Sequence, residues 1–116
     1  MYNRNVNLKL HFKDKRIRDL CEKRAVADKK LGAACARKLR TRLDDLDAAG
    51  RVTDLTAGNP HPLKGDRLGQ FALDLAGGWR LVFAPDQDPL PMNDDQSIDW
   101  PQVAIICIEF IGDYHD

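Results

Sequence analysis

The sequence has little of several features that would assign it to a specialised class of protein. Its longest uninterrupted apolar run covers residues 103–108, whereas a membrane-spanning helix needs about 20 apolar residues. The first seven residues, MYNRNVN, contain no apolar stretch of signal-peptide length. The three cysteines, Cys21, Cys35 and Cys107, are odd in number and widely spaced, which fits neither a disulfide framework nor a zinc site. We therefore expect a cytoplasmic protein that does not associate with membranes.

A net charge is also lacking, because 18 Lys and Arg balance 18 Asp and Glu. The two signs are nevertheless segregated along the chain. Residues 1–42, the basic half, hold 14 Lys and Arg against 4 Asp and Glu, whereas residues 43–116 hold 4 against 14. This split favours an anionic partner for the basic half, either nucleic acid or an acidic protein. The alternative interpretation is a solvated helix surface that is simply rich in Lys and Arg.

The chain has the length of one domain, and we expect residues 1–116 to form a single unit. Strand alternation and helical apolar spacing both occur, so the predicted class is α+β. The expected elements are, in order, a strand over 6–12, a helix over about 15–24, a helix over about 29–48, a β-hairpin over 71–83 around Gly77-Gly78, and a strand over 103–111. This order, β-α-α-β-β-β, predicts two N-terminal helices packed on a small, mostly antiparallel sheet.

The helix ends and two connections carry further signals. Asp14 and Asp28 are the expected N-caps of the two helices, and Gly50 is expected to end the second helix. Residues 58–66 contain two prolines and two glycines, which excludes a helix or a central strand. Residues 84–101, the acidic connection, contain five aspartates and no Lys or Arg, and are predicted to form a mobile loop.

Polar residues that suggest chemistry occur at three places in the sequence, which can meet at one end of the sheet. They are the loop residues His61, Lys64 and Arg67, the outward-facing Arg80 of the hairpin, and the tail residues Asp113, Tyr114 and His115. Taken singly, each has a simpler interpretation. His61 between prolines is then a turn residue, Arg80 is the ion-pair partner of a residue such as Glu109, and the tail is an exposed end.

Taken together, these residue types match the requirements of RNA cleavage without a metal ion. That reaction needs a base for the 2′-hydroxyl proton, an acid for the leaving 5′-oxygen, and fixed cations for the charge of the transition state. Histidine, with an ordinary pKa of about 6.5, can serve in either proton role. The side chains of Lys64, Arg67 and Arg80 would supply the cations.

At these same positions the sequence resembles a known family. The strings HPLKGDR at 61–67, GQF at 69–71, GWRLVF at 78–83 and DYH at 113–115 are similar, in order and spacing, to motifs of HigB-type toxins. These are the plasmid-maintenance killer proteins of the RelE/ParE superfamily, and the resemblance extends over most of the chain. It implies a RelE-like fold and the function of the toxin in a type II toxin–antitoxin system. Such a toxin would act as a ribosome-dependent, metal-independent endoribonuclease that cleaves messenger RNA and inhibits translation.

The resemblance also implies a set of site residues and partners. The catalytic residues are expected to be His61, Lys64, Arg80, Tyr114 and His115, with Arg67 and Asp113 binding the substrate. No metal or organic cofactor is expected. The implied partners are the ribosome with its messenger RNA and a HigA-type helix-turn-helix antitoxin that inhibits the toxin. Operator DNA would be contacted only indirectly, through the antitoxin.

Two non-catalytic functions remain open. A ParE-like protein would poison gyrase by binding it, although the set of His61, Lys64 and His115 argues against this, because a pure binder needs no proton-transfer groups. A non-catalytic homologue would only form a repressor complex with its antitoxin. The balanced net charge is compatible with this second alternative.

Overall fold

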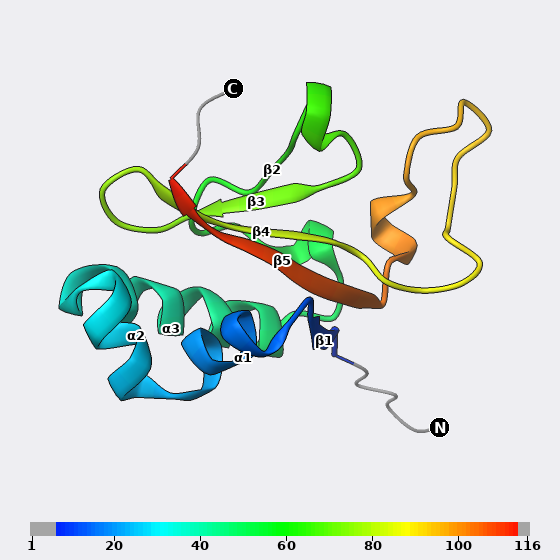
Figure 1. Ribbon diagram of the computed structural model, residues 1–116. Coiled ribbons are helices and arrows are strands. Elements are labelled where there is room, and N and C mark those ends of the chain that lie inside the picture. The colour runs from blue at the N-terminus through cyan, green and yellow to red at the C-terminus, as the bar shows by residue number, and fades with distance from the viewer. Residues whose placement is uncertain (1–6, 114–116) are drawn as a thin grey trace.

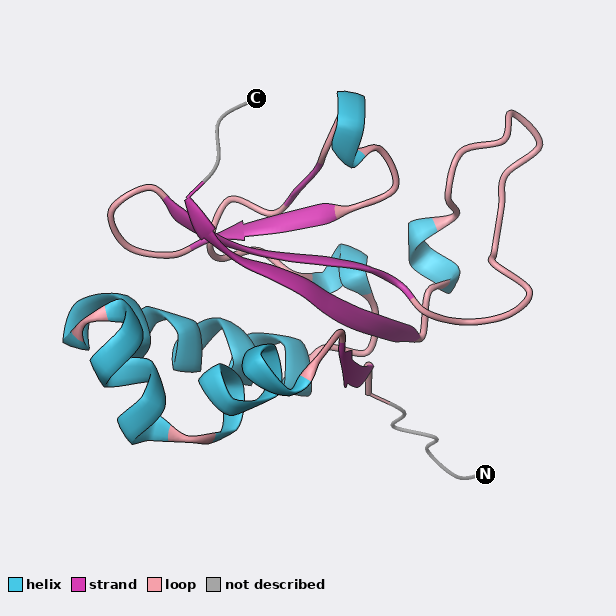
Figure 2. Ribbon diagram, viewed as in Figure 1, coloured by secondary structure: helices cyan, strands magenta, loops and turns pink. Residues whose placement is uncertain are grey.

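The computed structural model describes residues 7–113, which fold into a layer of helices against a sheet (Figure 1). Loops join the elements and a long one precedes the last strand (Figure 2). The α-helices and strands are, in chain order, β1 (Lys9–Phe12), α1 (Lys15–Glu22), α2 (Arg24–Leu31), α3 (Ala33–Ala48), β2 (His61–Pro62), β3 (Phe71–Asp74), β4 (Trp79–Pro85) and β5 (Ile105–Asp113). Three short 3-10 turns lie between them, η1 (Val52–Asp54), η2 (Gly65–Arg67) and η3 (Trp100–Gln102).

The first helix begins where the sequence predicts. The Asp14 carboxylate accepts a hydrogen bond of 2.9 Å from the backbone N–H of Ile17, as an N-cap does. Ile17 and Leu20, one turn apart, are buried against the sheet. At the other end of the helical layer, α3 stops at Ala48, two residues before Gly50, as predicted. No helix in the described part of the chain has the length and apolar character that crossing a membrane requires.

The predicted second helix is wrong in one respect, because the chain breaks it in two at Gly32. This glycine has a φ of +84°, which other residues adopt only with strain. Asp28, the expected N-cap, therefore lies inside α2. Its carboxylate oxygens lie 3.7 Å from Arg24 Nε and 3.5 Å from Arg40 Nη1, so the residue ties α2 to α3 instead of starting a helix. The described chain thus has three α-helices where two were expected.

The five strands form one mixed sheet in the order β1-β5-β4-β3-β2. β1 pairs with β5 in parallel, and the remaining pairs are antiparallel. The α+β class is confirmed, as is the place of β5 inside the sheet. The expected strand count is wrong by one, because His61 and Pro62 add a short edge strand within the loop that was excluded only from a central position. The first strand also precedes the helices, so the helices do not begin the fold.

The two faces of the sheet are covered differently. The inner face packs against the helices and forms the main core, in which the fully buried side chains include Leu39, Leu46, Leu73, Leu81, Phe83, Ile106 and Ile108. The outer face, away from the helices, carries a smaller cluster of Leu63, Ala72 and Val82 with Phe110 packed against it.

The acidic connection is attached to the sheet at both of its ends. At its start, Gln87 Oε1 accepts hydrogen bonds from the backbone N–H groups of Ala104 (2.7 Å) and Ile105 (3.0 Å). Near its end, Trp100 makes an edge contact with the Phe71 ring at 4.9 Å between centroids. These contacts fix both ends of the connection to the sheet.

Candidate functional site

The sheet register brings the predicted loop and hairpin residues onto one surface. Residues directly opposite each other on neighbouring strands project to the same face. One row on the outer face therefore runs across β2, β3, β4 and β5 as His61, Ala72, Val82 and Phe110. The adjacent row holds Asp74 on β3 and Arg80 on β4. Arg80 thus lies on the face opposite the helices, as predicted from the alternation of the hairpin.

His61 is held in a defined orientation at the edge of this surface. Its Nδ1 lies 2.6 Å from the backbone carbonyl oxygen of Asn59. A carbonyl oxygen only accepts hydrogen bonds, so Nδ1 carries the hydrogen and Nε2 of the neutral ring keeps a free lone pair. Asn59 has a φ of +52°, in the left-handed region. The arrangement suits Nε2 as a proton acceptor.

Arg80 forms an ion pair with Asp74 across the hairpin, with 3.4 Å between Nε and Oδ1. The Oδ1 atom is buried and has no hydrogen-bond partner within the described range, so the ion pair is what offsets the cost of its burial. The interpretation of Arg80 as a strand-face ion-pair residue is therefore correct, but its partner is Asp74 and not Glu109. The guanidinium is held on the outer face, one row from His61.

Asp74 links several parts of the site. Its second carboxylate oxygen accepts a long hydrogen bond of 3.5 Å from the side-chain amide of Asn59, the residue whose carbonyl orients His61. Its backbone N–H donates to the carbonyl of Gly58 at 2.7 Å. Its own carbonyl accepts from Arg42 Nε at 3.3 Å. Asp74 therefore connects the helical layer to both His61 and Arg80.

Sequence reasoning missed Asp74, Asn59 and Arg42. The hairpin register around Gly77-Gly78 places Asp74 opposite Arg80 and could have identified it. No comparable signal existed for Arg42, one of many cations in the basic half. Yet it is buried, with 8% of its surface exposed, and Nη1 lies 2.7 Å from Asp45 Oδ2.

Arg67 reaches the outer face from the η2 turn. Its guanidinium carbon lies 4.6 Å from the centroid of the Phe110 ring, and its Nη1 donates to Gln70 Oε1 at 3.3 Å. The Phe110 ring in turn covers Gly112, where a Cβ atom would lie only 2.7 Å from the ring. Lys64, just before η2, is exposed, and its side chain forms no hydrogen bond with a described residue, although its carbonyl accepts one from the Arg67 N–H at 3.1 Å.

The tail is only partly visible. Asp113 ends β5, where it is exposed and opposite Trp79. Tyr114 and His115 lie outside the described residues. The structure thus brings His61, Arg67 and Arg80 onto one sheet face, and places Asp113 at the end of the strand that carries Phe110 and Gly112.

Cys107 of β5 also lies on the outer face of the sheet, opposite His11 of β1. It is not a suitable nucleophile. Burial, reinforced by the carboxylates of Glu109 and Asp86, raises the pKa of its thiol to about 11. The reactive thiolate is therefore scarce at neutral pH. Within residues 7–113, no group of three or more His, Cys, Asp or Glu side chains is placed to hold a metal ion.

Neither a protein-family model nor a curated protein matches this sequence. Several solved structures share its fold. A YoeB/ParE toxin from Agrobacterium tumefaciens superposes with a TM-score of 0.59 at 14% identity, covering 93% of this chain and all of the other. The YoeB–YefM complex from Staphylococcus aureus superposes with a TM-score of 0.56 at 18% identity. The YoeB dimer from the same organism superposes with a TM-score of 0.55 at 19% identity, and each match covers 96% of this chain and all of the other. The chain therefore has the fold of YoeB-type toxins.

Proposed function

We propose that this protein is the toxin of a type II toxin–antitoxin pair, and that it cleaves messenger RNA on the ribosome as a HigB-type endoribonuclease. The observation that carries the proposal is the fixed tautomer of His61, whose Nδ1 bond to Asn59 leaves Nε2 as a proton acceptor. Two arginines lie on the same sheet face, and the fold is that of YoeB-type toxins.

In the proposed reaction, Nε2 of His61 takes the proton of a ribose 2′-hydroxyl while that oxygen attacks the neighbouring phosphorus. The 5′-oxygen leaves with a proton from a general acid, a role we assign to Tyr114 or His115. Arg67 and Arg80, with Lys64, stabilise the negative charge of the pentacoordinate transition state. The products are a 2′,3′-cyclic phosphate and a 5′-hydroxyl, and neither a metal nor an organic cofactor takes part.

The distribution of charge supports a role for the ribosome. Beyond residue 42, the chain has only four Lys and Arg, namely Arg51, Lys64, Arg67 and Arg80. Single-stranded RNA is bound mainly through phosphate neutralisation, so the isolated site should hold it weakly. The basic half forms the helices on the opposite side of the sheet from the site (Figure 1). Docked on ribosomal RNA, this side would present the outer face to a messenger that is already extended.

The same proposal includes an antitoxin partner. The Staphylococcus aureus YoeB structure is of a complex with YefM, described as a toxin–antitoxin complex. By analogy we propose that a HigA-type helix-turn-helix protein binds and inhibits this chain, with operator DNA contacted through that partner alone. A small helix-turn-helix protein encoded next to this one, and able to prevent growth arrest when co-expressed, is the expected finding.

The experiment that tests the catalytic proposal compares two histidines. We expect His61→Ala to abolish growth arrest and the appearance of new RNA ends with cyclic phosphates after induction. His11→Ala is the matched control, because His11 lies on β1 and pairs with Asp86 at 2.7 Å, away from the proposed centre. Growth arrest by the unmodified protein without new RNA ends would instead indicate a toxin that acts by binding.

The ribosome proposal has its own test. Lys29, Arg37 and Lys38 are exposed on α2 and α3. Reversing all three to Glu should weaken co-sedimentation with ribosomes and toxicity together, while slow cleavage of free RNA is unchanged. Equal rates of cleavage for free and ribosome-bound messenger in the unmodified protein would contradict a ribosome-dependent mechanism.

A further inference from the structure

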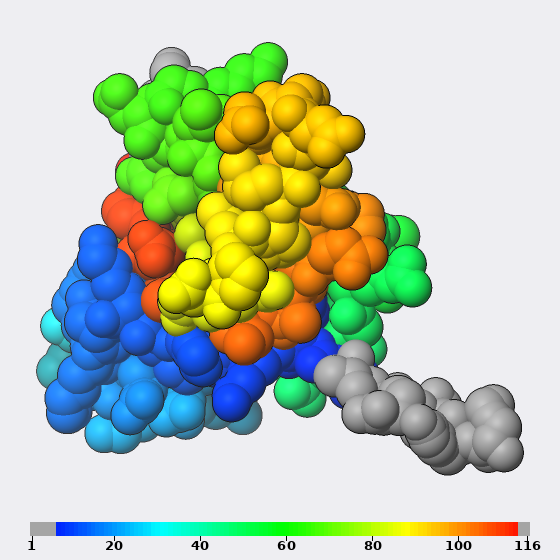
Figure 3. Space-filling model, turned by 90° about the vertical axis from the view of Figure 1, so that its right-hand side faces the viewer, coloured from blue at the N-terminus to red at the C-terminus, as the bar shows by residue number. Residues whose placement is uncertain are grey.

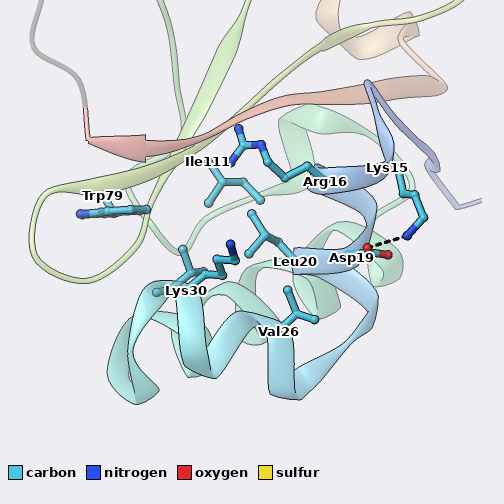
Figure 4. Close-up of a pocket in the computed structure, with 9 residues that line it drawn as sticks. Lys15, Arg16, Asp19, Leu20, Val26, Lys30, Trp79 and Ile111 are labelled. Atoms are coloured by element: carbon cyan, nitrogen blue, oxygen red, sulfur yellow. Dashed lines mark hydrogen bonds and ion pairs between the residues drawn. The ribbon is translucent and has the colours of Figure 1, made fainter.

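A groove with an apolar floor lies between the helices and the tip of the β3–β4 hairpin, at the far end from the acidic connection. It encloses about 580 Å³. Figure 4 shows Leu20 and Val26 rising from α1 and α2 toward Ile111 of β5, with the Trp79 ring closing one side. We call it the Trp79 groove. Its lining leaves apolar surface accessible on an otherwise polar helical layer.

The rim of the Trp79 groove is basic. Lys15, Arg16 and Lys30 all border it. Lys15 is bound by Asp19 at 2.9 Å, and this hydrogen bond is the main cause of the lowered pKa of the Asp19 carboxyl. Arg16 and Lys30 form no ion pair with another described residue and are exposed. The groove therefore fits a segment that offers both apolar side chains and carboxylates.

The acidic connection has that chemistry. Within the described range, only three large hydrophobic side chains are classed as exposed, and two of them, Leu90 (40% exposed) and Met92 (44%), lie in it. Asp88 and Asp94 flank them and form no ion pair with a described residue. Figure 3 shows the connection, coloured yellow to orange, standing out on the surface beside the segment that includes β2 and η2.

The connection also has a defined shape. Met92 and Ile98 form a β-bridge. The Asn93 N–H donates to the Ser97 carbonyl at 2.8 Å, and the Asp99 N–H to the Pro91 carbonyl at 3.0 Å. A preformed loop loses less conformational entropy on binding than a flexible one does. It is therefore suited to dock as a unit.

The connection cannot enter the groove of its own molecule. β4 starts at the groove with Trp79 and ends at Pro85, the second residue of the connection. Its seven residues span about 20 Å at the usual rise of a strand. The two features thus lie toward opposite ends of the sheet (Figure 1). The hydrogen bonds of Gln87 to Ala104 and Ile105 hold the connection at its own end.

We propose that the Trp79 groove binds the acidic connection of a second copy of this chain, with Leu90 and Met92 over the apolar floor and the nearby aspartates against Arg16 and Lys30. The contact is heterologous, because one molecule contributes the groove and the other the connection. A single loop in a groove buries less surface than a standard stable interface, so the association is weak and depends on protein concentration and salt.

The test uses two variants of the full chain. R16E/K30E reverses the rim of the groove and leaves the connection intact. L90K/M92K replaces the apolar side chains of the connection with two cations among its aspartates and leaves the groove intact. We expect sedimentation equilibrium to show self-association of the unmodified protein, weakened at least tenfold in each variant and by high salt. Circular dichroism verifies that both variants are folded.

Matched controls carry the same chemical changes elsewhere. K38E reverses a cation on α3 outside the groove. L68K replaces the third exposed hydrophobic residue, Leu68, which is 80% exposed in another loop. Both controls should associate like the unmodified protein. A loss of association in either control as large as in the paired variant would overturn the proposal, because charge or hydrophobicity in general would then be responsible.

The decisive measurement mixes the two variants. R16E/K30E still has an intact connection and L90K/M92K still has an intact groove. A heterologous contact therefore predicts a 1:1 heterodimer that is tighter than the self-association of either variant alone. Absence of that heterodimer would overturn the proposal. An unmodified protein that stays monomeric up to about 1 mM at low salt would do the same, and is the result expected if the groove serves a different acidic protein.

Discussion

The guanidinium carbon of Arg67 lies 4.6 Å from the centroid of the Phe110 ring, which joins the η2 turn to the strand β5. This contact places a cation over the outer face of the sheet. The ring lies where it does because Gly112, one row further along β5, has no side chain. The position of a proposed phosphate-binding arginine therefore depends, through the Phe110 ring, on the glycine at residue 112.

Gly112→Ala is expected to displace the Phe110 ring. A Cβ at residue 112 would lie 2.7 Å from the far atom of the ring, closer than carbon atoms can approach. We expect a loss of about 1–3 kcal/mol in the free energy of unfolding, the usual cost of overpacking. Urea denaturation measures it, and RNA cleavage by the variant reports whether Arg67 is displaced as well.

A double variant isolates the cause. Phe110→Leu shortens the side chain and removes the atom that would clash. In that background, Gly112→Ala should cost no more than about 0.5 kcal/mol, as for a site without special contacts. An unchanged cost would show that the backbone at residue 112, and not the ring, is sensitive to the substitution.

The elements that the sequence predicted well are those with strong local signals. The Asp14 cap, the Gly77-Gly78 hairpin and the apolar strand β5 each follow from residues close together in the chain. The break at Gly32 was missed because the apolar spacing continues across it, and a glycine inside a helical pattern is a weak signal. The structure of the acidic connection depends on the hydrogen bonds of Gln87 with Ala104 and Ile105. These residues are far apart in the sequence, so no local pattern predicts the contacts.

In the candidate site, too, residues with local sequence signals were predicted and those that depend on distant contacts were not. The loop and hairpin motifs identified His61, Arg67 and Arg80, which the sheet brings to one face. The residues that hold them, above all Arg42 and Asp74, were missed because their roles require the approach of α3 to the end of β3. Sequence patterns reveal reactive groups more readily than the residues that orient them.

Gly58→Ala is expected to disrupt the contact of Arg42 with the segment that precedes His61. Gly58 has a φ of +83°, and a Cβ there would lie 2.5 Å from Arg42 Nε. Arg42 is buried and bonds the Asp74 carbonyl and the Asp45 carboxylate, so it has little freedom to move. We expect a loss of about 2–4 kcal/mol, because backbone strain and displacement of a buried charge both contribute.

Gly77→Ala is the matched control for this prediction. Gly77 also has a positive φ, +64°, but a Cβ there meets nothing within 4 Å. Gly77→Ala should therefore lower the free energy of unfolding only by the backbone strain, about 1–2 kcal/mol. Equal losses for Gly58→Ala and Gly77→Ala in urea denaturation would contradict a specific role for the Arg42 contact.

Gln87→Ala is expected to release the start of the acidic connection. The two backbone N–H groups that donate to Gln87 Oε1 would then bond to water instead. We expect a loss of about 1 kcal/mol in the free energy of unfolding. Hydrogen exchange of the Ala104 and Ile105 amides should accelerate. Gln87→Glu keeps an acceptor oxygen and should preserve slow exchange, and Gln102→Ala, at an exposed position, should have no effect. Fast exchange in Gln87→Glu would show that the amide's shape or its N–H₂ group matters more than the accepted bonds.

Cys107 is expected to resist alkylation until the solution is strongly alkaline. Burial, with the charges of Glu109 and Asp86, raises the pKa of the thiol to about 11 from an ordinary value of 9.0. At pH 8 the thiolate fraction is then about 100-fold lower than that of an ordinary cysteine. In a variant with Cys21→Ala and Cys35→Ala, iodoacetamide should react with Cys107 at a rate that rises with pH up to about 11.

The same shift has a consequence for stability, with a definite sign. The folded pKa lies above the unfolded one, so the folded state retains the proton more tightly and this contribution is fully present below about pH 9. It is lost as the pH rises toward about 11. The lysines titrate in the same pH range. Comparing urea denaturation of this single-cysteine variant with that of the same protein carrying Cys107→Ala therefore separates the contribution of Cys107 from theirs. Glu109→Gln should shift the alkylation profile to lower pH, because one of the charges that disfavour the thiolate is removed. A profile centred near pH 9 in the folded protein, like that in concentrated urea, would contradict the proposed environment of Cys107.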